Sequence, residues 1–254
     1  MTSDQIDTIV GAGLIVIAAV ALFVLAVPLR GRVRRVFRII PGIVRLRRAI
    51  GLTVENGRRL HVSLGGGSLT GASGAVSLAA LSTLDRIAAL SMISDRPPIA
   101  TSGEGSLSIL SQDELRSAYR DGNALDQYDR DRGRLGGVTP LSYAAGTMPV
   151  IRDEQVSANI LVGNFGSEVG LMTDAAYRQQ AFVVAASDSL PAQAVIYSAA
   201  QEPLIGEELF AVPAYLQAGP FHVASLQVQD ILRWVVIALI LGGIILKLLG
   251  VSLL

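Results

Sequence analysis

The 254-residue sequence contains no cysteine and a single lysine, and both absences exclude chemistry. Without cysteine the chain cannot form disulfides, hold an iron–sulfur cluster or thiol-ligated zinc, or use a thiolate nucleophile. The lysine, Lys247, lies inside the C-terminal apolar run. The polar part of the chain therefore has no lysine for a Walker A loop or for a Schiff base with PLP.

Histidine is scarce as well. His61 falls in a predicted strand and His222 lies close to an apolar run, so neither is placed as a mobile base, and two histidines do not make a multi-histidine metal site. The chain has no G-x-S-x-G nucleophile elbow, and its paired acidic residues are sequence neighbours that point in different directions. We expect no catalytic residues, no metal site and no cofactor, and hence no enzyme.

Apolar residues, in contrast, make up 51% of the chain. Thr8–Val27 is a charge-free run of 20 residues, enough at about 1.5 Å per residue to cross a hydrocarbon core of about 30 Å. The flanking residues Asp4 and Asp7 do not suit a signal peptide, so we expect an uncleaved anchor. A second apolar run closes the chain. The sequence predicts transmembrane helices in residues 1–29 and 231–254.

The segment between the first anchor and the central domain, residues 30–48, is rich in arginine and has no acidic residue. By the positive-inside rule it lies in the cytoplasm, which puts both termini outside and residues 49–230 inside. We expect it to continue out of the bilayer, break at Pro41 and lie along anionic lipid headgroups. A nucleic-acid arm is the alternative interpretation. The arginines are Arg30, Arg32, Arg34, Arg35, Arg38, Arg45, Arg47 and Arg48.

The central segment, residues 49–230, is acidic and alternates between strand and helix patterns. It carries 19 acidic residues against 11 arginines, a net charge of −8, which does not suit nucleic acid as a partner. Its pattern predicts an α/β, Rossmann-like fold with a largely parallel sheet and helices on both faces. The expected strands are 59–64, 98–102, 137–139, 158–163 and 181–186, and the expected helices are 75–94, 106–121, 140–154, 168–180, 191–200 and 207–217. Residues 121–137 are expected to form a long surface loop.

A glycine-rich loop follows the first expected strand. Gly65, Gly66, Gly67 and Ser68 lie between a strand and a helix, where a parallel sheet binds phosphates. With Gly71 the spacing is G-x-G-x-x-x-G rather than the dinucleotide fingerprint, and no acid directly ends the next strand. A close backbone turn or subunit contact is the favoured interpretation, and nucleotide or small-anion binding is the alternative.

A second candidate loop follows the fourth expected strand. Asn164 and Ser167 could present amide and hydroxyl groups to a small anion, but Glu168 beside them would repel it. We therefore expect Ser167 to cap the next helix.

Several stretches resemble an uncharacterised bacterial family of two-span membrane proteins, described as a domain of unknown function. They are "HVSLGGGSL", "YAAGTM", "PLIGEELFA" and "ASLQVQDILRW", and the resemblance covers nearly the whole chain. It implies that both spans and the α/β domain form one unit, and it implies no ligand or catalytic residue.

Taken together, the sequence predicts a non-enzymatic, oligomeric scaffold in the bacterial plasma (inner) membrane, with the lipid bilayer as partner. Gly11, Gly13, Gly242 and Gly243 in the two spans would allow close helix contact and favour a homo-oligomer. One alternative is a membrane-tethered sensor of a nucleotide or small anion. Another is an accessory subunit of a transport or secretion complex, with other membrane subunits as partners.

Overall fold

The computed structural model describes residues 3–29, 38–92, 94 and 96–248. The chain divides into two compact units. One is a helical unit from Met1–Val36 and Gly219–Leu254, and the other is a sheet domain, Phe37–Ala218. The two are described separately.

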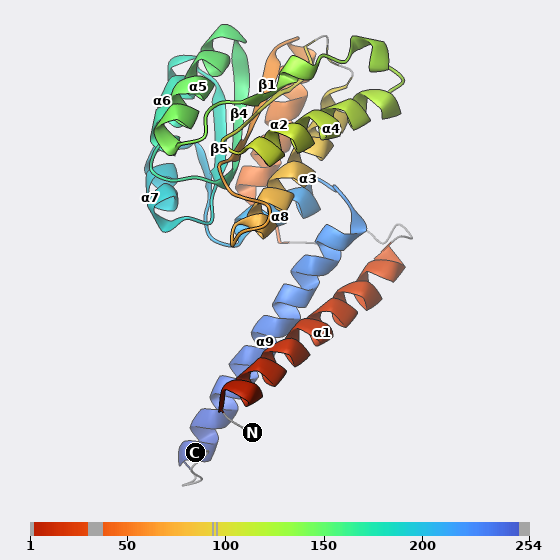
Figure 1. Ribbon diagram of the computed structural model, residues 1–254, viewed down its shortest axis with the longest axis vertical. Helices are drawn as coiled ribbons and strands as arrows, with labels where there is room; N and C mark the ends of the chain where they lie inside the picture. The colour runs from red at the N-terminus through yellow and green to blue at the C-terminus, as the bar shows by residue number, and fades with distance from the viewer. Residues whose placement is uncertain (1–2, 30–37, 93, 95, 249–254) are drawn as a thin grey trace. The chain divides into compact units, whose positions relative to one another are not determined.

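The described part of the sheet domain contains six strands, and every neighbouring pair is parallel. The strand order is β3-β2-β1-β4-β5-β6, which reverses between β1 and β4 as in doubly wound sheets (Figure 1). Burial of the central strands on both faces explains their nearly continuous apolar runs. The predicted α/β class and parallel sheet are confirmed. The strands are β1 Arg59–Gly65, β2 Ile99–Ser102, β3 Gly133–Leu135, β4 Val156–Asn164, β5 Phe182–Ala186 and β6 Glu202–Leu204.

Helices cover both faces of the sheet (Figure 1). On one face lie α2 (Pro41–Glu55), α3 (Gly74–Ser91), α4 (Gly105–Asp121) and α8 (Glu208–Tyr215). On the other lie α5 (Pro140–Asp153), α6 (Val169–Arg178) and α7 (Leu190–Ala199). All the helices expected from the sequence of this domain are present within a few residues of their predicted ends.

The two edges of the sheet differ from expectation. The third strand is Gly133–Leu135 rather than residues 137–139, and it follows two short 3₁₀ turns, Leu125–Gln127 and Arg130–Arg132. The sixth strand, Glu202–Leu204, was not expected. Both edge strands have three residues and carry a charged side chain, so neither forms an apolar run. Thr139 instead caps α5 in a capping box with Ser142.

Helix α2 corrects the interpretation of the second half of the Arg-rich segment. Its apolar side chains Ile43, Leu46 and Ile50 are buried, and the helix contacts β4, β5 and β6. A Cβ added at Gly42 would lie 3.0 Å from Cδ2 of Leu204 on β6, so the helix lies close to the sheet. The apolar side of this segment therefore packs on the sheet and is not available to a bilayer.

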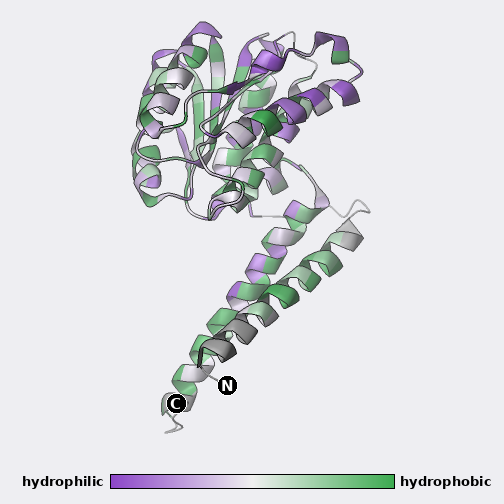
Figure 2. Cartoon of the chain, in the orientation of Figure 1, coloured by the Kyte–Doolittle hydropathy of each residue, from purple (hydrophilic) through white to green (hydrophobic). Residues whose placement is uncertain are grey.

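The helical unit consists of α1 (Ser3–Leu29) and α9 (Pro220–Leu248), which pack against each other. Within α9, Pro220–Ile245 is long and apolar enough to cross a membrane (Figure 2). In α1 the apolar stretch Gly11–Ala26 does not meet the same criterion over its described residues. The C-terminal candidate span is thus supported by length and composition, and the N-terminal one is not.

The glycines of these two helices do not lie at the contact between α1 and α9, and their expected role in a homo-oligomer stays a prediction. A Cβ added at Gly11, Gly13, Gly242 or Gly243 would meet nothing within 4 Å. Packing of α1 on α9 therefore does not depend on glycine at these positions.

Candidate functional site

The glycine loop lies at the point where the strand order reverses. Gly65 ends β1 and is paired with Asn164 at the end of β4. The amide of Gly66 donates a hydrogen bond of 2.9 Å to the carbonyl oxygen of Asn164. The chain then leaves β1 for α3 on one face and leaves β4 for α6 on the other. The two loops singled out from the sequence thus meet at the reversal, where doubly wound sheets bind ligands.

Two of the loop glycines are required by close packing. Gly65 has φ +75°, and a Cβ there would overlap the backbone of Asn164. Gly67 is buried, and a Cβ there would lie 2.8 Å from Oγ of Ser73. Gly66, in contrast, is exposed, and the nearest atom to an added Cβ is Cα of Gly103 at 3.9 Å. The geometry of Gly65 and Gly67 supports a close backbone turn.

Hydroxyl groups of α3 and its N-terminal turn hold the loop in place. Ser73 Oγ donates to the carbonyl oxygen of Ser68 at 3.2 Å, and Ser77 Oγ donates to that of Gly67 at 3.1 Å. Ser73 is the N-cap residue of α3 but makes no side-chain cap hydrogen bond to the helix. Ser68 is exposed at the rim of the loop.

Carboxylates of the chain occupy the N-terminal turns of the neighbouring helices. Glu104 Oε2 accepts from the amide of Leu107 at 2.9 Å and from the hydroxyl of Ser106. The Ser106 hydrogen bond, together with that amide, holds the pKa of Glu104 below its usual range. At the start of α6, Glu168 Oε1 accepts from the amide of Gly166 at 2.8 Å. These carboxylates disfavour a second anion at either helix.

In the Asn164–Ser167 loop, a polar side chain likewise has a partner within the protein. Asn164 Nδ2 donates to Oδ1 of Asp188 at 2.8 Å, which brings a further carboxylate to the mouth of the loop. Ser167 is exposed and provides no side-chain cap to α6, so the expectation that it caps this helix is wrong. The carboxylates of Asp188 and Glu168 beside Asn164 and Ser167 disfavour an anion at this loop.

Tyr143 on α5 lies directly behind the glycine loop and was not identified as a site residue from the sequence. Its hydroxyl accepts from the amide of Gly65 at 3.3 Å, donates to the carbonyl oxygen of Thr101 at 3.1 Å and lies 2.5 Å from Oγ of Ser63. The ring is stacked on Phe165 with centroids 6.3 Å apart. Burial raises the pKa of Tyr143 to about 12, so the phenol stays protonated and connects the ends of β1 and β2.

His61 is fully buried in β1, between the two neighbouring strands. Its Nδ1 lies 2.6 Å from Oδ1 of Asn159, which can only accept, so the ring proton is on Nδ1. Nε2 then accepts from the hydroxyl of Thr101 at 2.9 Å. Burial lowers the pKa of His61 to about 4, and the ring is neutral near pH 7. The prediction that His61 is not a mobile base is confirmed.

The arginines expected at the membrane surface divide into two groups. Arg30, Arg32, Arg34 and Arg35 lie outside the described residues. Arg38 pairs with Glu208 at 3.0 Å and Arg45 with Glu202 at 2.5 Å, while Arg47 donates to the carbonyl oxygen of Tyr215. Arg48 is exposed. The described arginines thus belong to the sheet domain and are exposed on its surface.

Comparison with known proteins identifies a family but no activity. The family model described as Domain of unknown function (DUF6754) matches residues 3–254. The chain therefore belongs to this family, as the resemblance of its motifs implied. No curated protein and no solved structure matches the chain. Within the described residues no group of three or more His, Cys, Asp or Glu side chains is placed to hold a metal ion.

Proposed function

We propose that this DUF6754 chain is a membrane-anchored assembly protein without catalytic activity, whose sheet domains pack against one another. The observation that carries the proposal is the surface of α9. Its apolar side chains are exposed, with Trp234 71% and Leu239 70% accessible, over a helix long enough to span a bilayer. An apolar surface of this extent requires a lipid environment or protein partners.

In the proposed topology α1 accompanies α9 through the bacterial inner membrane. Both termini are outside, and the sheet domain lies in the cytoplasm beneath a positively charged segment facing anionic headgroups. The packing of α1 on α9 and the apolar character of Gly11–Ala26 support this arrangement. The arginines among residues 30–35, which follow α1 in the sequence, supply the positive charge that this topology requires on the cytoplasmic side.

Exposed apolar side chains suggest where copies of the sheet domain meet. Among the described residues of this domain, the large apolar side chains that are at least 70% exposed lie, with the exception of Ile39, on α5, α6, α7 or the loop before α5. This face is opposite to the one that carries α2 and α3. Copies confined to one bilayer meet at raised effective concentration, so a modest apolar contact suffices for association. These side chains are Val138, Leu141, Tyr177, Leu190 and Tyr197.

Co-purification of two differently tagged copies, expressed together and extracted in mild detergent, tests the proposal. We expect the copies to co-purify, and we expect the double substitution Leu190→Glu and Tyr197→Glu on α7 to prevent it. Ile109→Glu is the matched control, because Ile109 is 64% exposed on α4 at the other face. Failure of the unsubstituted copies to co-purify would count against assembly.

A second candidate function, binding of a nucleotide or small anion at the glycine loop, is favoured by one observation. The reversal of strand order places Gly66 and Ser68, both exposed, at the usual ligand position of doubly wound sheets. A ligand at 100 times its Kd would stabilise the domain by about 2.7 kcal/mol. A panel of nucleotides and phosphates tests this, with Gly66→Val as the blocking variant because Gly66 is exposed and a Cβ there has only Cα of Gly103 within 4 Å, at 3.9 Å. No stabilisation by any of them would exclude this candidate.

A role as accessory subunit of a transport or secretion complex remains the third proposal. It shares the anchor and the sheet domain with the first and differs in the partner. Co-purification of an unrelated membrane protein in fixed ratio with this chain would favour it over homomeric assembly.

A further inference from the structure

A group of arginines lies at the amino ends of β1, β2 and β3. The glycine loop lies at the opposite, carboxyl ends of the strands. Arg59 opens β1, Arg96 precedes β2, and Arg132 and Arg134 lie immediately before and within β3. Because the three strands are parallel and adjacent, their amino ends lie side by side. Helix α4 runs back from the carboxyl end of β2 toward the amino end of β3. Its last turn, which contains Tyr119, therefore lies near the amino ends of these strands.

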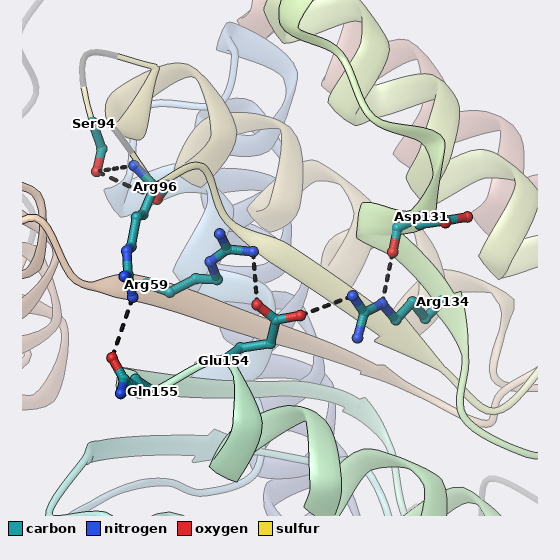
Figure 3. Close-up of polar contacts among 7 residues, drawn as sticks. All are labelled: Arg59, Ser94, Arg96, Asp131, Arg134, Glu154 and Gln155. Carbon is teal, nitrogen blue, oxygen red and sulfur yellow. Dashed lines mark hydrogen bonds and ion pairs between the residues drawn. The ribbon is translucent and has the colours of Figure 1, made fainter.

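The carboxylate of Glu154 pairs with two of these guanidinium groups. Glu154, just after α5, accepts from Nη1 of Arg59 at 2.9 Å and from Nη2 of Arg134 at 2.8 Å (Figure 3). Arg96 reaches the neutral amide of Gln155 at 3.3 Å. Glu154 is thus shared between two of the four arginines. Burial and the charges of Arg132, Arg96 and Arg134 lower the pKa of Arg59, against the opposing effect of Glu154.

Several buried hydrogen-bond donors in this cluster have no partner. Within the described residues, six buried side-chain polar atoms lack a hydrogen bond, and four of them belong to the cluster. They are Nε of Arg59, Nε and Nη1 of Arg132, and the hydroxyl of Tyr119, whose side chain is only 2% exposed. Buried polar groups in native proteins almost always have a partner, so a group of unpaired donors indicates a missing acceptor.

The unpaired donors lie at the same end of the sheet. Helix α4, which carries Tyr119, contacts β3 and the 3₁₀ turn Arg130–Arg132, and only β2 separates β3 from β1, which begins at Arg59. Burial raises the pKa of Tyr119, the charges of Arg132 and Arg59 lower it, and the charge of Asp129 raises it. Tyr119 also contacts Tyr128 edge-on, with ring centroids 5.6 Å apart, which fixes its ring. Asp129 itself is exposed, and its carboxylate accepts from the amide of Asp131.

We propose that Arg59, Arg132 and Tyr119 form a binding site for a phosphate group. Guanidinium groups present paired N–H donors that match the oxygens of a phosphate, and a tyrosine hydroxyl supplies a further donor. The phosphate belongs either to a soluble phosphate or phosphomonoester or to a phospholipid headgroup, since both present the same oxygens. The site is separate from the glycine loop, which lies at the other ends of the strands among the carboxylates of Glu104, Glu168 and Asp188.

Calorimetric titration of the full chain in a neutral detergent, at fixed ionic strength, tests the proposal. Inorganic phosphate is the soluble probe, and mixed micelles containing phosphatidic acid are the lipid probe, with phosphatidylserine micelles as their comparison. We expect saturable binding of one probe, weakened at least tenfold by Arg132→Gln and by Tyr119→Phe. Arg178→Gln is the matched control, because Arg178 pairs with Asp174 on α6, away from the cluster. Binding to inorganic phosphate identifies a soluble ligand, and binding to phosphatidic acid alone identifies a lipid.

Thermal unfolding without phosphate separates loss of the site from loss of the fold. Both substitutions remove buried donors that have no partner, so we expect each variant to melt at or above the temperature of the unsubstituted chain. No saturable binding of either probe, or equal binding by Arg132→Gln and Arg178→Gln, would overturn the proposal. A response that Gly66→Val abolishes and Arg132→Gln preserves would also overturn it and assign the anion to the glycine loop.

Discussion

The amide of Gly65 donates a hydrogen bond of 3.3 Å to the hydroxyl of Tyr143, a residue on the helix that covers the opposite face of the sheet from α3. The same hydroxyl donates to the carbonyl oxygen of Thr101 on β2. One phenol thus fixes the ends of two strands where the glycine loop begins. This contact and the close turn at Gly65 hold the start of the loop in place.

Removing the hydroxyl tests that connection. Tyr143→Phe leaves the amide of Gly65 and the hydroxyl of Ser63 without their buried partner, and we expect a loss of about 1–3 kcal/mol in the free energy of unfolding. Chemical denaturation followed by circular dichroism measures it. Tyr177→Phe is the control, because Tyr177 is 72% exposed and its hydroxyl is in water. Equal stability of the two variants would contradict the role given to Tyr143.

The two adjacent loop glycines are expected to respond differently to alanine. Gly65→Ala requires a positive φ and overlaps the backbone of Asn164, so we expect a loss of several kcal/mol or failure to fold. Gly66→Ala brings its methyl group no closer than 3.9 Å to Cα of Gly103 and should change stability by about 0.5 kcal/mol or less. Denaturation midpoints measure both. A Gly65→Ala variant as stable as Gly66→Ala would show that the turn at Gly65 does not exclude a side chain.

The buried histidine should make stability depend on pH. The pKa of His61 is about 4 in the folded state and about 6.5 when unfolded, so the unfolded chain binds more protons between these values. Stability conferred by the neutral ring is complete above pH 6.5 and is lost as the pH falls toward 4, by about 3 kcal/mol. Unfolding measured at pH 7 and pH 5 detects the loss. His61→Gln should remove this part of the pH dependence, and an unchanged dependence would contradict it.

The position of α2 can be tested by truncating its buried side. Leu46 is fully buried against the sheet domain, so Leu46→Ala should lower the free energy of unfolding by about 2–5 kcal/mol. Val44→Ala is the control on the same helix, because Val44 is 56% exposed. If this segment instead lay in the membrane surface, both variants would unfold like the original chain, and membrane binding would decrease.

The sequence was sufficient to identify the central strands and most helices, because buried parallel strands consist of apolar runs such as those of β4 and β5. The edge strands β3 and β6 were missed since three residues with a charged side chain give no periodic signal. Periodicity also identified the apolar side of α2 but not its partner. A stripe formed by Ile43, Leu46 and Ile50 suits a bilayer surface as well as a sheet.

Local sequence was a partial guide to the site. The glycine loop and Asn164 could be assigned to the carboxyl ends of strands, but their contact depends on strand order, which no local pattern specifies. Tyr143 and the cluster of Arg59, Tyr119 and Arg132 were missed for the same reason. Their members are distant along the chain and are brought together only by the crossover helices.

The native mass of the particle, extracted gently from membranes and measured with the detergent contribution subtracted, is the most direct test of membrane-anchored assembly. We expect a homomeric particle of at least two copies of the 26.7 kDa chain, recovered from the membrane fraction. A single species of monomer mass under these conditions, or recovery of the chain in the soluble fraction, would contradict the account.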